Sequence, residues 1–277
     1  MRMILILAAL AALAGCGVSK DDRSIVAAFY PLAFAAEEVA GSGVEVRNLT
    51  PPGVEPHDAE LSPRDVERVR SARVVLYLGG GFQPALEEAL DGARGQTVDL
   101  LRGLDVRTAG GAPDPHVWLD PQRYAQIAER VGDALGAPKR GSTLAGRIRE
   151  LDRELRSGLA HCRRRTIVTS HAAFGYLAAR YGLEQVAISG LSPESEPSPR
   201  AFERAAARVR RTGATTVFFE PLVSPRLARA VARETGARTD VLNPLEGLTQ
   251  SELQHGSDYF AVMQANLAAL RRGLECR

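Results

Sequence analysis

Three of the five histidines in this 277-residue chain stand where a structural element ends and a loop begins. Pro56 precedes His57, Pro115 precedes His116, and His171 directly follows an apolar, β-branched run. In open α/β sheets, ligands bind outside the carboxyl ends of the strands, so these histidines are expected to share one site. Imidazole suits zinc, copper, nickel and iron. Three imidazoles and one carboxylate would fill a tetrahedral Zn²⁺ site, which is the site that the sequence predicts.

The fourth ligand is expected from the acidic residues of segment 239–249. Glu246 is preferred because it lies in the loop beyond a predicted strand. Asp240 is the alternative, although it lies inside that strand, where its side chain could face away. Glu55, Glu220 and a water molecule are weaker options.

The surroundings of the histidines bear on metal binding. Pro56 and Pro115 restrict the loops that carry His57 and His116, so less entropy is lost on binding. His171 is expected to begin a helix, and the positive end of that helix would keep its ring neutral. The other two histidines, His161 and His255, lack such a setting and are expected to face solvent.

From residue 24 onward, short apolar runs alternate with helical runs, which is typical of mostly parallel sheets covered by helices. Strands are expected at 24–29, 44–49, 73–78 and 97–100 in the first half, and at 165–169, 184–189, 215–219 and 238–242 in the second. Helix starts are marked by Ser62-Pro63, Asp120-Pro121, Ser198-Pro199 and Ser224-Pro225. A helix from 142 to about 160 would be about 27 Å long, enough to connect two lobes as a stiff strut.

The predicted fold class is therefore α/β, with two lobes joined by one long helix. Each lobe is a mostly parallel sheet with flanking helices. The predicted division gives an N-terminal lobe at 24–141, a linking helix at 142–161 and a C-terminal lobe at 162–277.

Residues 1–15 have the charge and apolar pattern of a signal peptide. The run Leu13-Ala14-Gly15-Cys16 resembles the lipobox of bacterial lipoproteins, which implies a lipid on Cys16 and a tether at 16–23. The alternative is a plain signal peptide with an incidental cysteine. We expect an extracytoplasmic, membrane-anchored protein, at the cell surface or in a periplasm.

The remaining cysteines, Cys162 and Cys276, are expected to form one disulfide in an oxidising compartment. The alternative is two free, buried thiols. The formal net charge is only +2, so no strong field attracts nucleic acid, and we expect no nucleic-acid partner. A monomer is expected.

Four motifs resemble the zinc-uptake branch of the cluster A-I solute-binding proteins, the metal-binding lipoproteins of ABC importers. They are Pro-His-Asp at 56–58, Asp-Pro-His-Val-Trp-Leu-Asp-Pro at 114–121, Ser-His-Ala-Ala-Phe-Gly-Tyr at 170–176 and Asn-Pro-Leu-Glu at 243–246. The resemblance extends from Ser24 to the end of the chain. It implies two α/β lobes, a metal between them, Glu246 as fourth ligand and a membrane ABC permease as partner.

Two details of the resemblance concern the metal. The family's manganese members usually carry glutamate where His171 stands, so a histidine there indicates the zinc branch. Many zinc members carry a histidine-rich loop before the second ligand, whereas segment 108–115 here contains no histidine.

Other functions compete with zinc capture. Within the same class, the chain could serve a manganese or iron importer. A zinc hydrolase would need an open metal position to activate water and a base, for which Glu220 is the candidate. The sequence has neither a His-Glu-x-x-His helix nor a Gly-x-Ser-x-Gly elbow, so we expect no enzyme. A surface adhesin, a role described for this family, would be secondary to the metal site.

Overall fold

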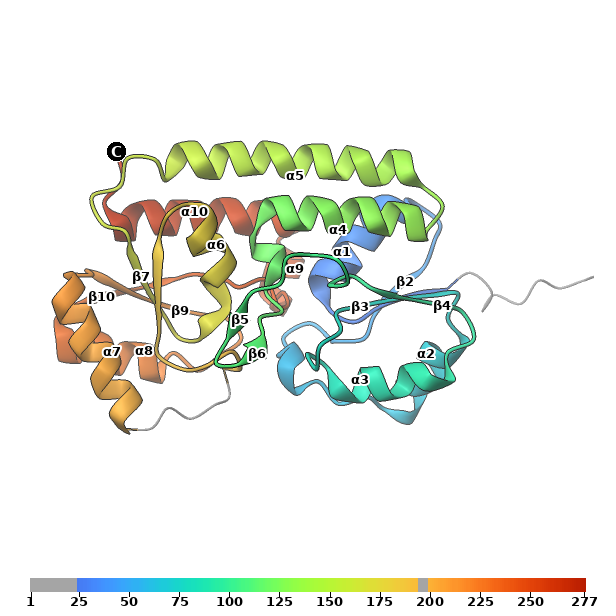
Figure 1. Ribbon diagram of the computed structural model, residues 1–277, viewed down its shortest axis with the longest axis horizontal. Coiled ribbons are helices and arrows are strands. Elements are labelled where there is room, and N and C mark those ends of the chain that lie inside the picture. The colour runs from blue at the N-terminus through green and yellow to red at the C-terminus, as the bar shows by residue number, and fades with distance from the viewer. Residues whose placement is uncertain (1–23, 194–198) are drawn as a thin grey trace, which may run out of the picture.

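A computed structural model describes residues 24–193 and 199–277 of the chain. The predicted signal peptide, the predicted tether and Cys16 lie outside the described residues, as does the predicted helix cap Ser198. The predicted fold class is confirmed: two parallel sheets flanked by helices form two lobes (Figure 1).

The two sheets repeat one topology. The first contains β1 (Ile25–Ala27), β2 (Val46–Asn48), β3 (Val74–Tyr77) and β4 (Gln96–Asp99), in the order β2-β1-β3-β4. The second contains β7 (Thr166–Thr169), β8 (Glu184–Ala187), β9 (Thr216–Phe219) and β10 (Arg238–Val241), in the order β10-β9-β7-β8. All pairings within these sheets are parallel, so in each lobe the carboxyl ends of the strands lie at one edge of the sheet.

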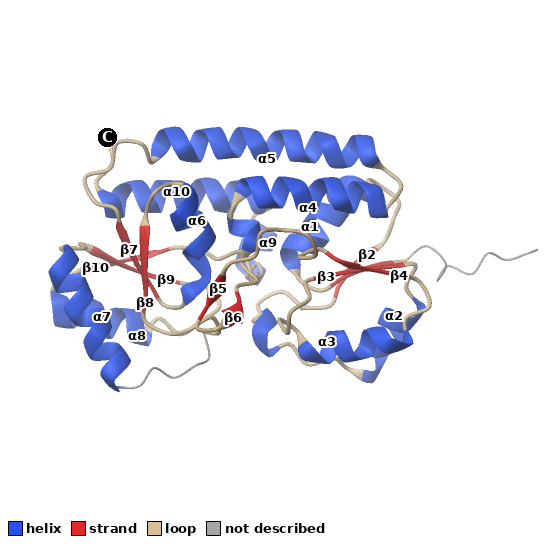
Figure 2. Cartoon of the chain, in the orientation of Figure 1, coloured by secondary structure: helices blue, strands red, loops and turns tan. Residues whose placement is uncertain are grey.

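Helices cover both faces of each sheet (Figure 2). Those of the first half are α1 (Tyr30–Ala40), α2 (Pro63–Ser71), α3 (Pro84–Ala89) and α4 (Pro121–Ala134). Those of the second half are α6 (Gly175–Arg180), α7 (Pro199–Thr212), α8 (Arg226–Thr235), α9 (Gln250–Gln254) and α10 (Tyr259–Leu274). Between them α5 (Pro138–Gly158) runs along both lobes beside α4 and α10. None of the described helices has the length and hydropathy needed to cross a bilayer.

Proline-bounded caps explain several helix starts. The Ser62 hydroxyl accepts the backbone N–H of Asp65 and completes a capping box, and the Asp120 carboxylate accepts the N–H of Gln122. Three predicted helix bounds differ from the structure. The linking helix α5 begins at Pro138 rather than 142, because Pro138 occupies its first position, and ends at Gly158. Helix α8 begins at Arg226, so Ser224 does not cap it.

Segment 108–113 forms a hairpin that the sequence did not predict. Strands β5 (Thr108–Ala109) and β6 (Ala112–Pro113) pair antiparallel around Gly110 and Gly111. Both glycines have positive φ, 61° and 87°, as a two-residue hairpin turn requires. The hairpin lies between β4 and His116 in the chain.

One large apolar cluster extends through both lobes. It includes Ile25 and Leu76 from the first sheet, Leu151 from α5, Ile167 from the second sheet and Leu270 from α10. A second, smaller cluster lies between the second sheet and helices α7 and α8. Because the larger cluster is shared, the two lobes are joined by packing as well as by α5.

Candidate metal centre

Each of the three predicted histidines lies in or directly before a short 3-10 turn. His57 lies in a 3-10 turn, Pro56–Asp58, that follows β2. His116 precedes a 3-10 turn, Val117–Leu119, that leads into α4. His171 stands two residues after β7 and precedes a 3-10 turn, Ala172–Phe174. His171 therefore closely follows a strand, as predicted, whereas His57 lies within a turn and His116 directly before one.

The structure brings these three histidines together with Glu246. The Oε1 atom of Glu246 lies 2.9 Å from Nε2 of His116 and 3.2 Å from Nε2 of both His57 and His171. The Nε2 atoms of His116 and His171 are 3.4 Å apart. One possible ligand atom from each of the four residues lies within 4.8 Å of all the others.

These distances fit a tetrahedral metal site. Ligands about 2.0 Å from a Zn²⁺ ion at tetrahedral angles would be about 3.3 Å from one another. Three of the four side chains are almost fully buried, and His57 is 9% exposed. The second oxygen of Glu246, Oε2, is buried without a hydrogen-bond partner. The four residues could therefore hold one transition-metal ion.

A carboxylate stands behind each of the two most buried histidines. Oδ1 of Asp114 accepts the backbone N–H of His116 at 3.0 Å and lies 2.7 Å from its Nδ1 atom. Glu220 contacts His171 in a similar way, with Oε2 2.6 Å from Nδ1. Both rings thereby turn Nε2 toward Glu246. His57 instead packs edge-on against the ring of Phe82, at a centroid distance of 4.8 Å.

The carboxylates decide the protonation of this site. Burial lowers the pKa of His171, but the negative charges of Glu246 and Glu220 outweigh it and raise that pKa well above its usual value. Burial works against ionisation of Glu246 too, yet the neighbouring histidines hold its pKa well below the usual range. The expectation that a helix end keeps His171 neutral was therefore wrong, because two carboxylates are closer. The ring must lose its proton before Nε2 can bind a metal ion.

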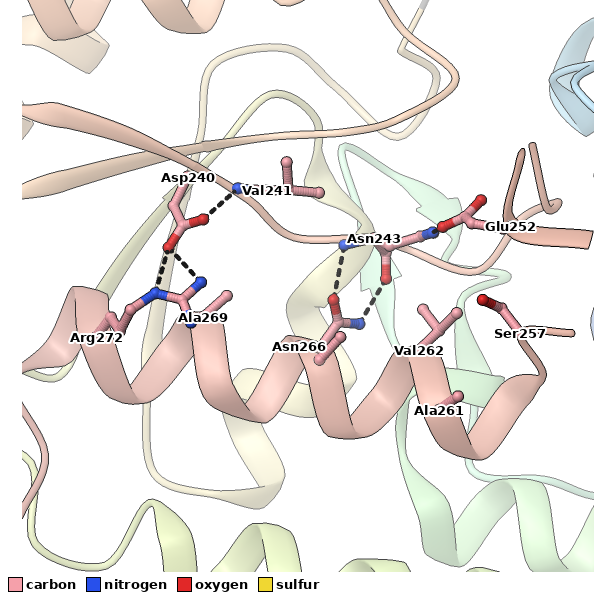
Figure 3. Close-up of a pocket in the computed structure, with 11 residues that line it drawn as sticks. Asp240, Val241, Asn243, Glu252, Ser257, Ala261, Val262, Asn266, Ala269 and Arg272 are labelled. Carbon is pink, nitrogen blue, oxygen red and sulfur yellow. Dashed lines mark hydrogen bonds and ion pairs between the residues drawn. The ribbon is translucent and has the colours of Figure 1, made fainter. Parts of the chain in front are cut away.

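Figure 3 shows how the loop that carries Glu246 is held against α10. The side chain of Asn266 on α10 accepts the N–H of Asn243 at 2.8 Å and donates to its carbonyl at 2.7 Å. Oδ1 of Asn243 then accepts the N–H of Leu245 at 2.7 Å. The indole N–H of Trp118 donates to the carbonyl of Pro244 at 2.7 Å. The loop is thus fixed from both sides immediately before Glu246.

Other acids considered from the sequence lie elsewhere. Asp240 forms an ion pair with Arg272 at 2.9 Å and accepts the N–H of Val241, so this alternative fourth ligand does not belong to the cluster (Figure 3). Burial, aided by the charge of Glu246, raises the pKa of Glu55 to about 9, and Oε1 of Glu55 accepts the backbone N–H of His57 at 3.4 Å. Glu220 faces Nδ1 of His171, the side of the ring opposite the shared centre.

Both histidines that were expected to face solvent, His161 and His255, are exposed.

The sequence did not reveal the roles of Asp114 and Asn266. The Asp-Pro-His motif contains a signal for Asp114, since a carboxylate two residues before a histidine can reach its ring. Asn266 carries no such local signal, because its partners are 23 residues away in sequence.

The fold and the site define a two-lobed protein with the ligand set for one transition-metal ion. A family model described as "Zinc-uptake complex component A periplasmic" matches residues 25–273. The chain belongs to this family.

Several known proteins are similar to this chain. The zinc-binding lipoprotein AdcA of Streptococcus pneumoniae is 33% identical over 98% of this chain and 60% of its own length. The high-affinity zinc uptake system protein ZnuA of Bacillus subtilis is 31% identical over 94% of this chain and 90% of its own. The chain spans only 56% to 60% of the length of the AdcA proteins that it matches.

Solved structures agree with the fold. The Zn(II)-bound ZnuA-like domain of Streptococcus pneumoniae AdcA has a TM-score of 0.79 and 35% identity, covering 91% of this chain and 98% of its own. The laminin-binding protein Lmb of Streptococcus agalactiae, described as a bifunctional adhesin and metal transporter, has a TM-score of 0.81 and 30% identity. That match covers 91% of this chain and 99% of Lmb.

Proposed function

We propose that this chain captures one Zn²⁺ ion between its lobes, outside the cytoplasm, and delivers it to the permease of an ABC importer. The observation that carries the proposal is the meeting of His57, His116, His171 and Glu246 around one centre. Membership of a zinc-uptake family and similarity to zinc-binding relatives support it. Three imidazoles favour zinc over manganese, which prefers oxygen ligands. A manganese or iron importer remains the competing assignment.

The position of Glu246 argues against hydrolysis. A hydrolytic zinc site keeps an open position for water, but Glu246 lies within 3.2 Å of all three histidines and would occupy that position. We infer that the chain binds and releases its metal without chemical turnover. Adhesion stays a secondary prediction.

Calorimetric titration tests the metal. The chain without residues 1–16 is stripped with chelator and titrated with Zn²⁺ and, separately, Mn²⁺. We expect one tight zinc site per chain, weakened more than about 100-fold in His171→Ala and Glu246→Ala, a loss larger than that from removing an outer partner of a ligand. Asp240→Ala is the matched control and should bind like wild type. Tight manganese binding with weak zinc binding would refute the zinc assignment.

We further infer that Cys16 carries a lipid that anchors the chain, on the strength of the Leu13–Cys16 motif. Mass spectrometry of the mature protein from membranes should find the lipid on an N-terminal Cys16. An unmodified mature N-terminus at another residue would exclude the anchor.

A further inference from the structure

Glu220 is a buried carboxylate beside the metal centre that is not itself one of the four ligands. It directly follows β9 and is 2% exposed. Strands β9 and β7 are parallel neighbours, with Phe218 paired to Thr169. Two residues beyond that pair, Glu220 and His171 stand side by side, at the point where the order of strands in the sheet reverses.

Both oxygens of Glu220 contact His171. Oε1 accepts the backbone N–H at 3.2 Å, and Oε2 lies 2.6 Å from Nδ1 of the ring, off the line of an ideal hydrogen bond. One side chain therefore fixes both the backbone and the ring of His171. With Nδ1 turned to a carboxylate, the proton of the neutral ring belongs on Nδ1, and Nε2 keeps its lone pair for a metal.

The charge around Glu220 is also informative. Within the described residues, its ion-pair contact is with His171 and with no arginine or lysine. A buried carboxylate is costly unless a positive charge offsets its own. A divalent ion on Nε2 of His171 would lie on the far side of the same ring and would offset that charge. Glu220 thus polarises the imidazole toward the metal.

Resting on the proposed zinc function, we propose that Glu220 is a positioning residue that makes His171 a strong, correctly oriented nitrogen donor and so biases the site toward zinc. A stronger nitrogen donor benefits Zn²⁺ more than Mn²⁺, because affinity for nitrogen ligands rises along that series of metals. Asp114 holds His116 from within the same loop, whereas Glu220 reaches His171 from a neighbouring strand. Glu220 is therefore the more informative residue to change.

The test compares wild type with Glu220→Gln, which keeps the shape of the side chain but removes its charge. Zn²⁺ affinity is expected to fall about 10- to 100-fold, the usual effect of losing an outer partner of a metal-bound histidine. Mn²⁺ affinity should fall less, so the ratio of the two affinities decreases. ¹H–¹⁵N NMR of the ring nitrogens reports in parallel whether His171 keeps its proton on Nδ1 in the zinc-bound chain. Glu184→Gln, an exposed acid on the same sheet, is the control.

The outcomes separate the two proposals. If wild type itself does not bind zinc, the proposed function fails. Suppose that wild type binds zinc. If Glu220→Gln then lowers the zinc and manganese affinities equally, or changes neither affinity, Glu220 has only a structural role and this inference is overturned. Should Glu220→Gln fail to fold, Glu220→Asp keeps the charge but withdraws it from Nδ1. The aspartate variant should also lower the zinc-to-manganese ratio, and an unchanged ratio would refute the inference.

Discussion

Leu245 has a left-handed backbone conformation, with φ of 60°, directly before Glu246. Such a conformation costs about 1 to 2 kcal/mol for a residue with a β-carbon. It persists here because Asn243 accepts the N–H of Leu245 and Asn266 holds Asn243. Strain of this kind occurs where the surrounding structure fixes a functional residue. The direction of the Glu246 side chain therefore depends on an asparagine of α10 that does not contact the metal centre.

Replacing Asn266 tests this dependence. Asn266→Ala leaves the N–H and carbonyl of Asn243 without partners, which should lower the free energy of unfolding by about 1 to 3 kcal/mol. Zinc affinity should fall as well, because the loop can relax and turn Glu246 away. Denaturant unfolding of the metal-free chain and zinc titration measure the two effects.

The control is Gln264→Ala, an exposed position on the same helix, which should change neither quantity. A destabilised Asn266→Ala chain that still binds zinc like wild type would show that the Glu246 loop does not need this clamp.

At the scale of elements, a buried ionic cluster joins three helices. Arg180 at the end of α6 donates to Asp152 of α5 at 2.6 Å and lies 3.2 Å from Asp120, the cap of α4. The hydroxyl of Tyr181 also donates to Asp152 at 2.9 Å. Because α6 follows His171 and α4 follows His116, the cluster fixes the helices behind two of the proposed ligands.

The cluster predicts a pH-dependent contribution to stability. Burial opposes ionisation of Asp152, but the hydrogen bonds from Arg180 and Tyr181 and the charge of Arg180 outweigh it, so its pKa is lowered in the folded chain. A lowered pKa stabilises the fold above the unfolded value, about 3.9, and this stabilisation is lost as pH falls through the folded value. Asp152→Asn should therefore cost about 2 to 3 kcal/mol at pH 7. The difference from wild type should shrink below about pH 4.

Denaturant unfolding at several pH values measures this contribution. Glu154→Gln, an exposed acid of α5, is the control. An Asp152→Asn deficit that is the same at pH 3 and pH 7 would contradict the electrostatic explanation.

Local sequence patterns predicted most helices and strands. They failed where contacts between distant parts of the chain determine the structure. The predicted strands lie within a few residues of those observed, because β-branched runs and proline-bounded caps are local signals. Helix α3 and the β5–β6 hairpin were not predicted, since six residues and a two-residue turn give little periodicity. The histidines were identified by their expected positions where an element ends and a loop begins. The role of Glu220 was not identified from the sequence, because that role depends on which strands are neighbours in the sheet.

At the scale of the whole molecule, the shared apolar cluster and α5 make the two lobes one packed body. Separating the lobes would expose part of that core to water, at about 25 cal/mol for each Å² of apolar surface. We therefore expect metal exchange to involve the loops at the site rather than wide lobe opening. Structures of the metal-free and zinc-bound chain would check this, and a hinge rotation between the lobes would contradict it.

A disulfide between Cys162 and Cys276 ties the C-terminus to the segment before β7. It closes a loop with a sequence separation of 114, and such a bond typically stabilises a fold by about 2 to 5 kcal/mol. Cys162→Ser with Cys276→Ser should lower the free energy of unfolding by this amount. Zinc affinity should stay unchanged, because neither cysteine belongs to the metal centre. Unfolding with and without reductant, followed by zinc titration, tests both expectations.

The same disulfide makes stability depend on where the chain is. A chain in a reducing cytoplasm keeps two thiols and lacks several kcal/mol of the stability of its final fold. It thus unfolds more readily, which would suit the extracytoplasmic location that we propose, because an exported polypeptide passes through a translocation pore as an extended chain. On that proposal, oxidation on the far side closes the bond after transit, and the helix that holds the Glu246 loop is then secured at its end.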